Sequence, residues 1–291
     1  MTMGYGFKMK KGISTVNTTR RHVLLGGASL ALAARAWRPA FAADDALRAL
    51  VDGPQRSPNA QARDMYRHPY ETLVFLGVEP TSTVIEIQPG GGYWTEILAP
   101  YLQAKGSYLA ALPPDQFASD EAKRENDVFN RKIAATPALY AQVKTVPFRG
   151  NQFDLAPAEK ADFVLTFRNV HNWMADGETD AAFAAFFKAL KPGGILGVEE
   201  HRGAPDTPQD PIAKSGYVRQ DVAVGFALKA GFVLAASSEI NANPKDTKDY
   251  PAGVWTLPPA YRLKDQDRDK YAAIGESDRF LLKFQKPKTS V

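Results

Sequence analysis

The sequence predicts an α/β protein with a doubly wound, mostly parallel sheet of seven strands that ends in an antiparallel edge strand. Three observations support this fold class. Short apolar runs alternate with amphipathic helical stretches, the runs are apolar on both faces, and the last two runs have no helix between them. Runs that are apolar on both faces are typical of parallel strands covered by helices. The last two strands are expected to pair antiparallel, because no crossover helix joins them.

The elements follow in order from these runs. Strands are expected, from the first to the last apolar run, at 83–87, 107–112, 143–147, 161–167, 195–199, 232–240 and 279–284. Helices are expected where apolar residues recur at helical spacing, at 63–77, 93–102, 119–134, 179–190 and 221–230. The first helix is expected to break or begin near Pro69, and Lys191-Pro192-Gly193-Gly194 to stop the helix 179–190.

The N-terminal 42 residues are typical of an export signal. Arg20-Arg21 precede an apolar run from Val23 to Ala34, and Ala40-Phe41-Ala42 forms a small-x-small cleavage site. The paired arginines indicate a twin-arginine signal, with the Tat export machinery as a partner and a periplasmic location. A Sec signal or an uncleaved anchor is the alternative. The apolar run is short for a bilayer and no longer one follows, so no membrane span is expected in the mature protein.

Charge and composition exclude several function classes. The formal charge is +4, but residues 1–42 hold seven basic residues and no acid, and the remainder has 29 basic and 32 acidic residues, a net charge of −3. With no stripe of Lys and Arg in this remainder, no nucleic-acid partner is expected. The absence of cysteine excludes disulfides, thiolate nucleophiles and Cys-ligated metal sites.

The expected organisation is a signal at 1–42, a linker at 43–62 and one folded domain at 63–291. A Pro-rich polar insertion at about 241–276 separates the last two strands. Its aromatic residues are expected to cover a pocket, or simply to pack.

A glycine-rich turn, Glu86-Ile87-Gln88-Pro89-Gly90-Gly91-Gly92, follows the first strand. In doubly wound sheets, ligands bind at the carboxyl ends of the strands, near the point where the strand order reverses. Glycines let the backbone approach a ligand and aim the amides of the next helix at it. A tight turn without a ligand is the alternative.

From about residue 63 to 286 the chain resembles class I S-adenosylmethionine (SAM)-dependent methyltransferases, which have a Rossmann-like fold. EIQPGGG resembles their motif I, acid-x-Gly-x-Gly-x-Gly, and ALKPGGILGVEEHR resembles the segment before their substrate loop. RDMYRHPYETLVFLGVEP and LTFRNVHNW are similar to a bacterial subgroup of predicted methyltransferases that often carry export signals. The resemblance implies SAM as the cofactor and methyl transfer, with a small molecule as the expected substrate.

The resemblance also implies a cofactor site along the turn, which includes Gln88 and Gly91. Gly90 and Gly92 would pass close to the methionine part of SAM, and Glu86 would hold the turn and interact with the amino end of the ligand. Two departures stand out. Gln88 replaces the first motif glycine, and Leu112 stands where an acid normally accepts hydrogen bonds from the ribose hydroxyls. Asp115 is the candidate substitute. A substitute is expected because leaving the ribose hydroxyls unpaired costs about 1–3 kcal/mol.

Polar residues follow the fourth and fifth strands. Arg168 and Asn169 are expected to hydrogen-bond ligands, and His171 to act as a general base or to orient one. Glu199 and His201 share one face of the fifth strand and are expected to help remove a proton from the substrate. A helix-capping loop and a surface ion-pair cluster are the alternatives. Three histidines beyond the signal and no cysteine give weak metal spacing, so no metal is expected.

Two other function classes remain open. An exported, non-enzymatic ligand-binding protein on a degenerate methyltransferase scaffold would explain Gln88 and Leu112 as drift, because a fold does not fix a function. An NAD(P)-linked oxidoreductase fits less well, because it requires G-x-G-x-x-G and this turn is shorter. If methyl transfer is retained, export of an already folded, cofactor-loaded chain reconciles a cytoplasmic cofactor with an export signal.

Overall fold

The computed structural model describes residues 44–149, 152–155 and 158–288, and the expected export signal lies outside them. These residues form a seven-stranded sheet with the order β3-β2-β1-β4-β5-β7-β6. Its strands are β1 (Thr83–Ile87), β2 (Ser107–Leu112), β3 (Lys144–Pro147), β4 (Ala161–Phe167), β5 (Leu190–His201), β6 (Val233–Ser238) and β7 (Arg279–Gln285). Strands β1 to β5 are parallel, and β7 runs antiparallel to both β5 and the edge strand β6. The predicted fold class is confirmed.

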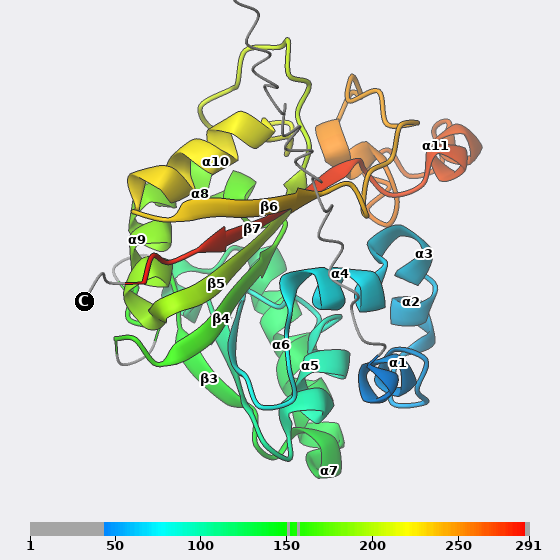
Figure 1. Cartoon of the computed structure of the whole chain (residues 1–291). Helices are drawn as coiled ribbons and strands as arrows, with labels where there is room; N and C mark the ends of the chain where they lie inside the picture. The colour runs from blue at the N-terminus through cyan, green and yellow to red at the C-terminus, as the bar shows by residue number, and fades with distance from the viewer. Residues whose placement is uncertain (1–43, 150–151, 156–157, 289–291) are drawn as a thin grey trace, which may run out of the picture. The chain divides into compact units, whose positions relative to one another are not determined.

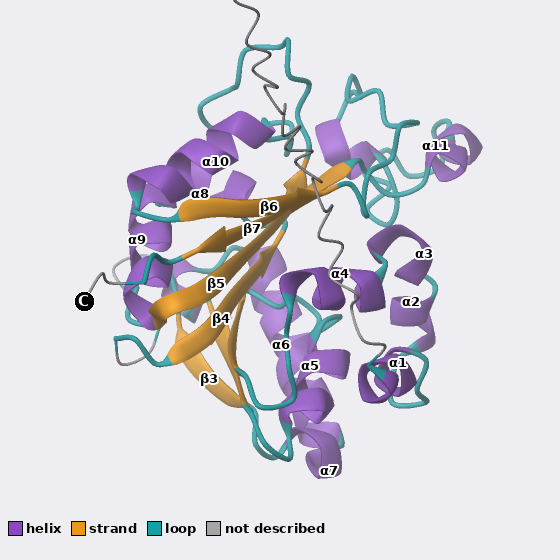
Figure 2. Cartoon of the chain, in the orientation of Figure 1, coloured by secondary structure: helices purple, strands orange, loops and turns teal. Residues whose placement is uncertain are grey.

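Helices cover both faces of the sheet (Figures 1 and 2). One face carries α8 (Val170–Asp176), α9 (Thr179–Ala189) and α10 (Gln220–Lys229). The other carries α1 (Asp45–Val51), α4 (Pro69–Leu76), α5 (Thr95–Leu102), α6 (Asp120–Ala135) and α7 (Pro137–Tyr140). Side chains of β1 alternate between the two cores, so that Ile85 and Ile87 pack toward α9 and Val84 toward α5. The same alternation directs Glu86 toward α5.

The strand order reverses between β1 and β4. The chain runs outward from β1 through β2 to β3 and then returns to β4 on the other side of β1. Ile87 at the end of β1 lies in register with Thr166 near the end of β4. The glycine turn and the polar segment after β4 therefore share the crevice in which doubly wound proteins bind ligands.

The segment expected to be a linker is folded. It contains α1 and α2 (Pro58–Gln61) and is followed by α3 (Asp64–Arg67). Leu47 and Val51, four residues apart on α1, are buried in the core, which is the burial that an i, i+4 apolar pair favours. The predicted break near Pro69 is confirmed, because His68 adopts a left-handed conformation (φ 41°) between α3 and α4.

Three further segments differ from the expectation. Helix α8 occupies the segment after β4, where no helix was expected. Strand β5 begins at Leu190, because the residues that follow pair with neighbouring segments of the same protein. The Gly193 amide, for example, donates to the Lys286 carbonyl at 2.9 Å. The insertion contains a 3-10 turn, η2 (Gly253–Thr256), and α11 (Arg268–Ile274). Within the described residues, no helix combines the length and the apolar character needed to cross a membrane.

Candidate functional site

The turn after β1 alternates left-handed backbone positions. The angle φ is 48° at Gln88, 57° at Gly90 and 82° at Gly92, whereas Gly91 is not left-handed. The amide of Gln88 donates to the carbonyl of Ala111 on β2 at 2.8 Å, which fixes the start of the turn. Left-handed backbone is costly for residues with a Cβ. Gln88 thus keeps a conformation that glycine adopts readily, although the motif glycine is absent.

The carboxylate of Glu86 is buried between β1, β2 and α5. Its Oε2 accepts hydrogen bonds from the Tyr108 hydroxyl at 2.6 Å and the Thr95 hydroxyl at 3.4 Å. Burial raises the pKa of Glu86 to about 7, while these two hydrogen bonds act in the opposite direction. The side chain therefore ties β1 to the helix that follows the glycine turn. Tyr108 was not singled out from the sequence, since it looks like an ordinary apolar strand residue.

Helix α6 lies across the glycine turn. A Cβ added at Gly90 would sit 3.3 Å from Glu125 Oε1, and one added at Gly92 would sit 3.3 Å from Lys132 Cδ. Lys132 Nζ also donates to the Gly92 carbonyl at 3.3 Å. Glycine is therefore favoured here by the backbone angle, and side chains of α6 lie close to the turn. The sequence predicted this helix but not its place over the turn.

The candidate ribose acceptor, Asp115, opens a 3-10 turn, η1 (Asp115–Phe117), just beyond the end of β2. It is exposed and lines a cavity of about 280 Å³ together with Leu112 and Asn126. Asn126 Nδ2 donates to the Pro113 carbonyl at 3.0 Å, which fixes α6 to this loop. The cavity lies at the carboxyl ends of β2 and β3, on the binding edge of the sheet.

The side chains of Arg168 and Asn169 differ in their hydrogen bonds. Asn169 is buried, and its amide donates to the Ile87 carbonyl at 2.9 Å and to Thr166 Oγ1 at 3.1 Å. It thereby holds the ends of β1 and β4 together. Arg168 is left-handed (φ 63°), and its amide donates to the Glu199 carbonyl at 2.7 Å. Its Nε is buried and has no hydrogen-bond partner among the residues that the structure describes.

A histidine–carboxylate pair lies at the start of α8. His171 Nδ1 is 3.1 Å from Glu200 Oε1, and the His171 amide donates to Glu200 Oε2 at 3.2 Å. The His201 amide donates to the same carboxylate at 2.7 Å. His171 and Glu200 are both buried. The carboxylate fixes the orientation of the His171 ring through Nδ1, so Nε2 is the nitrogen that would accept a proton. This is the arrangement expected of a general base and its orienting acid.

Glu199 was expected beside the histidines but lies elsewhere. Its carboxylate accepts a hydrogen bond from Asn241 Nδ2 at 2.7 Å and contacts Arg279 NH1 at 3.3 Å. Glu200 takes the place that the sequence assigned to Glu199. Glu200 lies on the same face of β5 as Val198, which packs into the core that contains α8, so the alternation of the strand places Glu200 and not Glu199 beside His171. His201, the last residue of β5, departs from the alternation, since its ring also lies near His171.

His201 lies next to this pair. Its ring is 5.4 Å from that of His171, and its Nδ1 is 2.6 Å from Ser277 Oγ. Burial, followed by the nearness of His171 and Arg168, holds the pKa of His201 well below its usual range. The ring is therefore neutral at pH 7. Trp255 of the insertion packs edge-on against His171, with the ring centres 5.8 Å apart.

The same three side chains could also bind a metal ion. Donor atoms of His171, Glu200 and His201 all lie within 4.8 Å of one another. Two histidines and a carboxylate are a common ligand set for zinc and non-haem iron. However, protein donors already use both oxygens of Glu200, so the arrangement fits an acid–base pair better than a metal centre.

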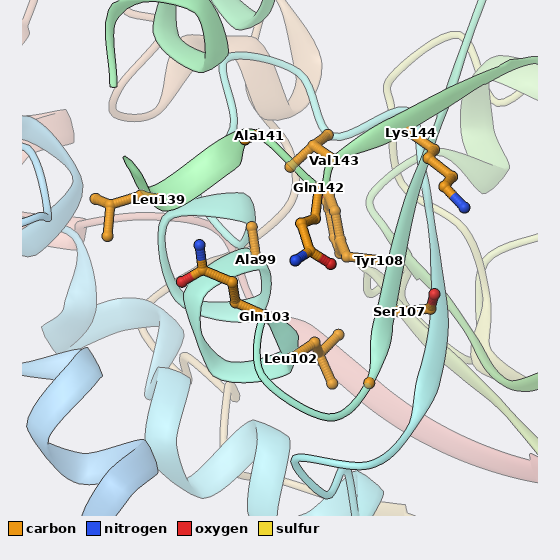
Figure 3. A pocket seen from close by; sticks show the side chains of 11 residues that line it. Ala99, Leu102, Gln103, Ser107, Tyr108, Leu139, Ala141, Gln142, Val143 and Lys144 are labelled. Carbon is orange, nitrogen blue, oxygen red and sulfur yellow. The ribbon is translucent and has the colours of Figure 1, made fainter. Parts of the chain in front are cut away.

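A second cavity, of about 200 Å³, lies away from these residues (Figure 3). It opens between the end of α5, the start of β2 and α7, and its lining includes Leu102, Ser107 and Leu139. This is the amino end of β2, opposite the edge at which doubly wound sheets bind ligands. The cavity contains none of the residues predicted for the site.

Comparison with known proteins supports the fold. No protein-family model matches the sequence, and no curated protein sequence matches it. A SAM-dependent methyltransferase from Aquifex aeolicus superposes with a TM-score of 0.53 at 14% identity, over 79% of this chain and 94% of that chain. The [4+2]-cyclase SpnF superposes with a TM-score of 0.52 at 16% identity, over 84% of this chain and 92% of that chain.

The chain therefore has the Rossmann-like fold of SAM-dependent methyltransferases. A cyclase with a similar fold shows that the fold alone does not fix the reaction. The function has to be argued from the site.

Proposed function

We propose that this protein is a SAM-dependent methyltransferase that acts on a small molecule. The observation that carries the proposal is the turn after β1, with left-handed backbone at Gln88, Gly90 and Gly92 at the reversal point of the strand order. Such a turn lets the backbone approach a ligand, and doubly wound sheets bind their ligands at this point. Gly90 and Gly92 would contact the methionine part of SAM.

The cavity at the ends of β2 and β3 is the place for the adenosine part. Leu112 offers the ribose no acceptor, whereas the exposed carboxylate of Asp115 lies at the cavity wall. We assign the ribose hydroxyls to Asp115. With this assignment the cofactor would extend from the cavity to the glycine turn along the carboxyl ends of β2 and β1.

Bound SAM would supply an electrophilic methyl group on a sulfonium centre. The site then has to hold the acceptor in line with that group and to remove its proton. His171 Nε2 is the base, and Glu200 keeps the other ring nitrogen hydrogen-bonded. His201, which burial keeps neutral, is a second acceptor for the proton. Positioning of the two reactants contributes the larger part of the rate, and Trp255 shields the base from water.

We also propose that the protein is exported through the twin-arginine pathway to the periplasm. The support is the sequence of residues 1–42, with Arg20-Arg21 before a modest apolar run. Replacing both arginines by lysine should retain the protein in the cytoplasm, as measured by cell fractionation. Unchanged periplasmic recovery of this variant would contradict the assignment.

A non-enzymatic ligand-binding protein is the second candidate. The observation that favours it is the position of α6, whose Glu125 approaches the turn at Gly90. An acid above the turn occupies space that a cofactor needs, unless it meets the amino group of that cofactor.

One experiment separates the two candidates. In a thermal-shift titration with S-adenosylhomocysteine, a methyltransferase should be stabilised, and the Gly92→Val variant should lose the effect, since φ is 82° there. A folded wild-type protein that is indifferent to this ligand would favour the second candidate.

A further inference from the structure

Four arginines from distant parts of the chain meet at the carboxyl edge of the sheet. Arg63 and Arg67 come from the α3 region, Arg168 follows β4, and Arg279 begins β7. Arg67 and Arg279 are each only 1% exposed. Burying a guanidinium is costly unless an anion and hydrogen bonds compensate. These side chains therefore need anionic partners.

Two carboxylates pair with three of the four arginines. Glu276 contacts Arg63 Nε at 2.5 Å, Arg67 Nε at 3.3 Å and Arg279 NH1 at 3.1 Å. Glu199 contacts Arg279 NH1 at 3.3 Å. Burial opposes the charge of Glu276, yet the three arginines hold the pKa of that carboxyl well below its usual range. Both carboxylates are thus already paired within the cluster.

Arg168 has no such partner. Among the described residues, its side chain forms no hydrogen bond or ion pair, and its Nε is buried. Arg67 NH2 and Arg279 Nε are likewise buried without hydrogen-bond partners. Glu199 and Glu276 attract Arg168 only at longer range, and both are already paired with the other arginines of the cluster. The cluster therefore has unused donors and one unpaired cation.

These donors lie beside the proposed base. His201 is in register with Arg279 across β5 and β7, and Arg168 precedes His171 by three residues. Arg168, Arg279 and Arg67 each help to lower the pKa of His201, after burial and His171. Arg168 and Arg63 also lie near Glu125, which approaches the glycine turn at Gly90. The cluster is therefore close to both the histidines and the turn.

We infer that Arg168, together with Arg63, Arg67 and Arg279, binds a carboxylate or phosphate group of the acceptor substrate. Guanidinium groups bind both oxyanions through paired hydrogen bonds. The identification of the bound molecule as the methyl acceptor rests on the proposed function. The inference thereby narrows the substrate class to small organic anions whose methylated atom lies within reach of His171.

The test uses inorganic phosphate and S-adenosylhomocysteine as separate probes, in thermal-shift titrations at constant ionic strength. Phosphate should stabilise the wild-type protein, and Arg168→Gln should weaken its binding at least tenfold. Arg168→Lys should retain part of the effect. The surface variant Arg131→Gln, which removes an exposed arginine of α6, should bind phosphate as the wild type does.

Phosphate binding that is equal in Arg168→Gln and wild type would overturn the inference. So would a tenfold loss of S-adenosylhomocysteine binding in Arg168→Gln without a loss for 5′-methylthioadenosine, which lacks the carboxylate, because Arg168 would then hold the cofactor. If phosphate binding depends on Arg168 but the wild type ignores S-adenosylhomocysteine, the anion site stands and the proposed methyl transfer fails.

Discussion

The Gly90→Ala substitution separates ligand binding from backbone strain when it is compared with Gly177→Ala. Both glycines are left-handed, with φ of 57° and 70°. An alanine in this conformation costs about 1–2 kcal/mol, which for a chain of this size lowers Tm by roughly 2–8 °C. Both variants should lose stability by this amount, because neither added methyl group makes a hard contact. At Gly90 the nearest atom is Glu125 Oε1 at 3.3 Å, and at Gly177 nothing lies within 4 Å.

Only Gly90→Ala should lose the ligand. Its methyl group enters the space between the turn and α6, where the methionine part of the cofactor is proposed to lie. We expect S-adenosylhomocysteine to bind at least about tenfold more weakly, or about 1.4 kcal/mol, while Gly177→Ala binds as the wild type does. Calorimetry on the three proteins, with Tm measured in parallel, provides the comparison. Equal affinities of Gly90→Ala and wild type would refute the role of the turn.

Three other substitutions test the remaining parts of the structure. Burial raises the pKa of Glu86 from 4.5 to about 7, so the folded state favours the protonated acid. The stability of the wild type relative to Glu86→Gln should therefore be highest below pH 4.5 and fall by about 3 kcal/mol as the pH rises to 7; denaturant unfolding that shows no pH trend in this difference would contradict the assignment. Glu200→Gln should reduce kcat for methyl transfer by roughly 10²-fold with little change in KM, and a wild-type kcat would remove His171 from the role of base. Gly197→Ala should lower the free energy of unfolding by about 1–3 kcal/mol through overpacking, because its Cβ would lie 2.8 Å from Leu76 Cδ2. A Tm equal to that of the wild type would show that the neighbouring side chains move to make room.

The sequence predicted most of the fold because the signals were local. Apolar runs and helical periodicity locate each strand, and the missing crossover before β7 indicates its antiparallel pairing. The burial of α1 could not be predicted, because two apolar residues, Leu47 and Val51, are too few to stand out in a polar segment. Helix α8 was missed because its residues were read as binding groups.

The site was less predictable, since it depends on contacts between distant residues. Glu200 rather than Glu199 meets His171, because Glu200 shares the face of β5 that packs against α8, and His201 at the end of the strand turns toward the same side. Glu276 forms ion pairs with arginines of the α3 region and of β7, which lie more than two hundred residues apart in the sequence. The insertion that carries Glu276 has no motif that would reveal this. Sequence patterns therefore located the edge of the sheet at which the site lies, but not the partners within it.

The central claim is that the glycine turn binds SAM, and calorimetry on the purified protein tests it most directly. The protein should first be unfolded and refolded to remove any ligand that it carries, and then titrated with SAM and with S-adenosylhomocysteine. The structure predicts saturable binding of both in the micromolar range, with one site per chain. A refolded protein that unfolds cooperatively but gives no binding heat at several temperatures would contradict the claim.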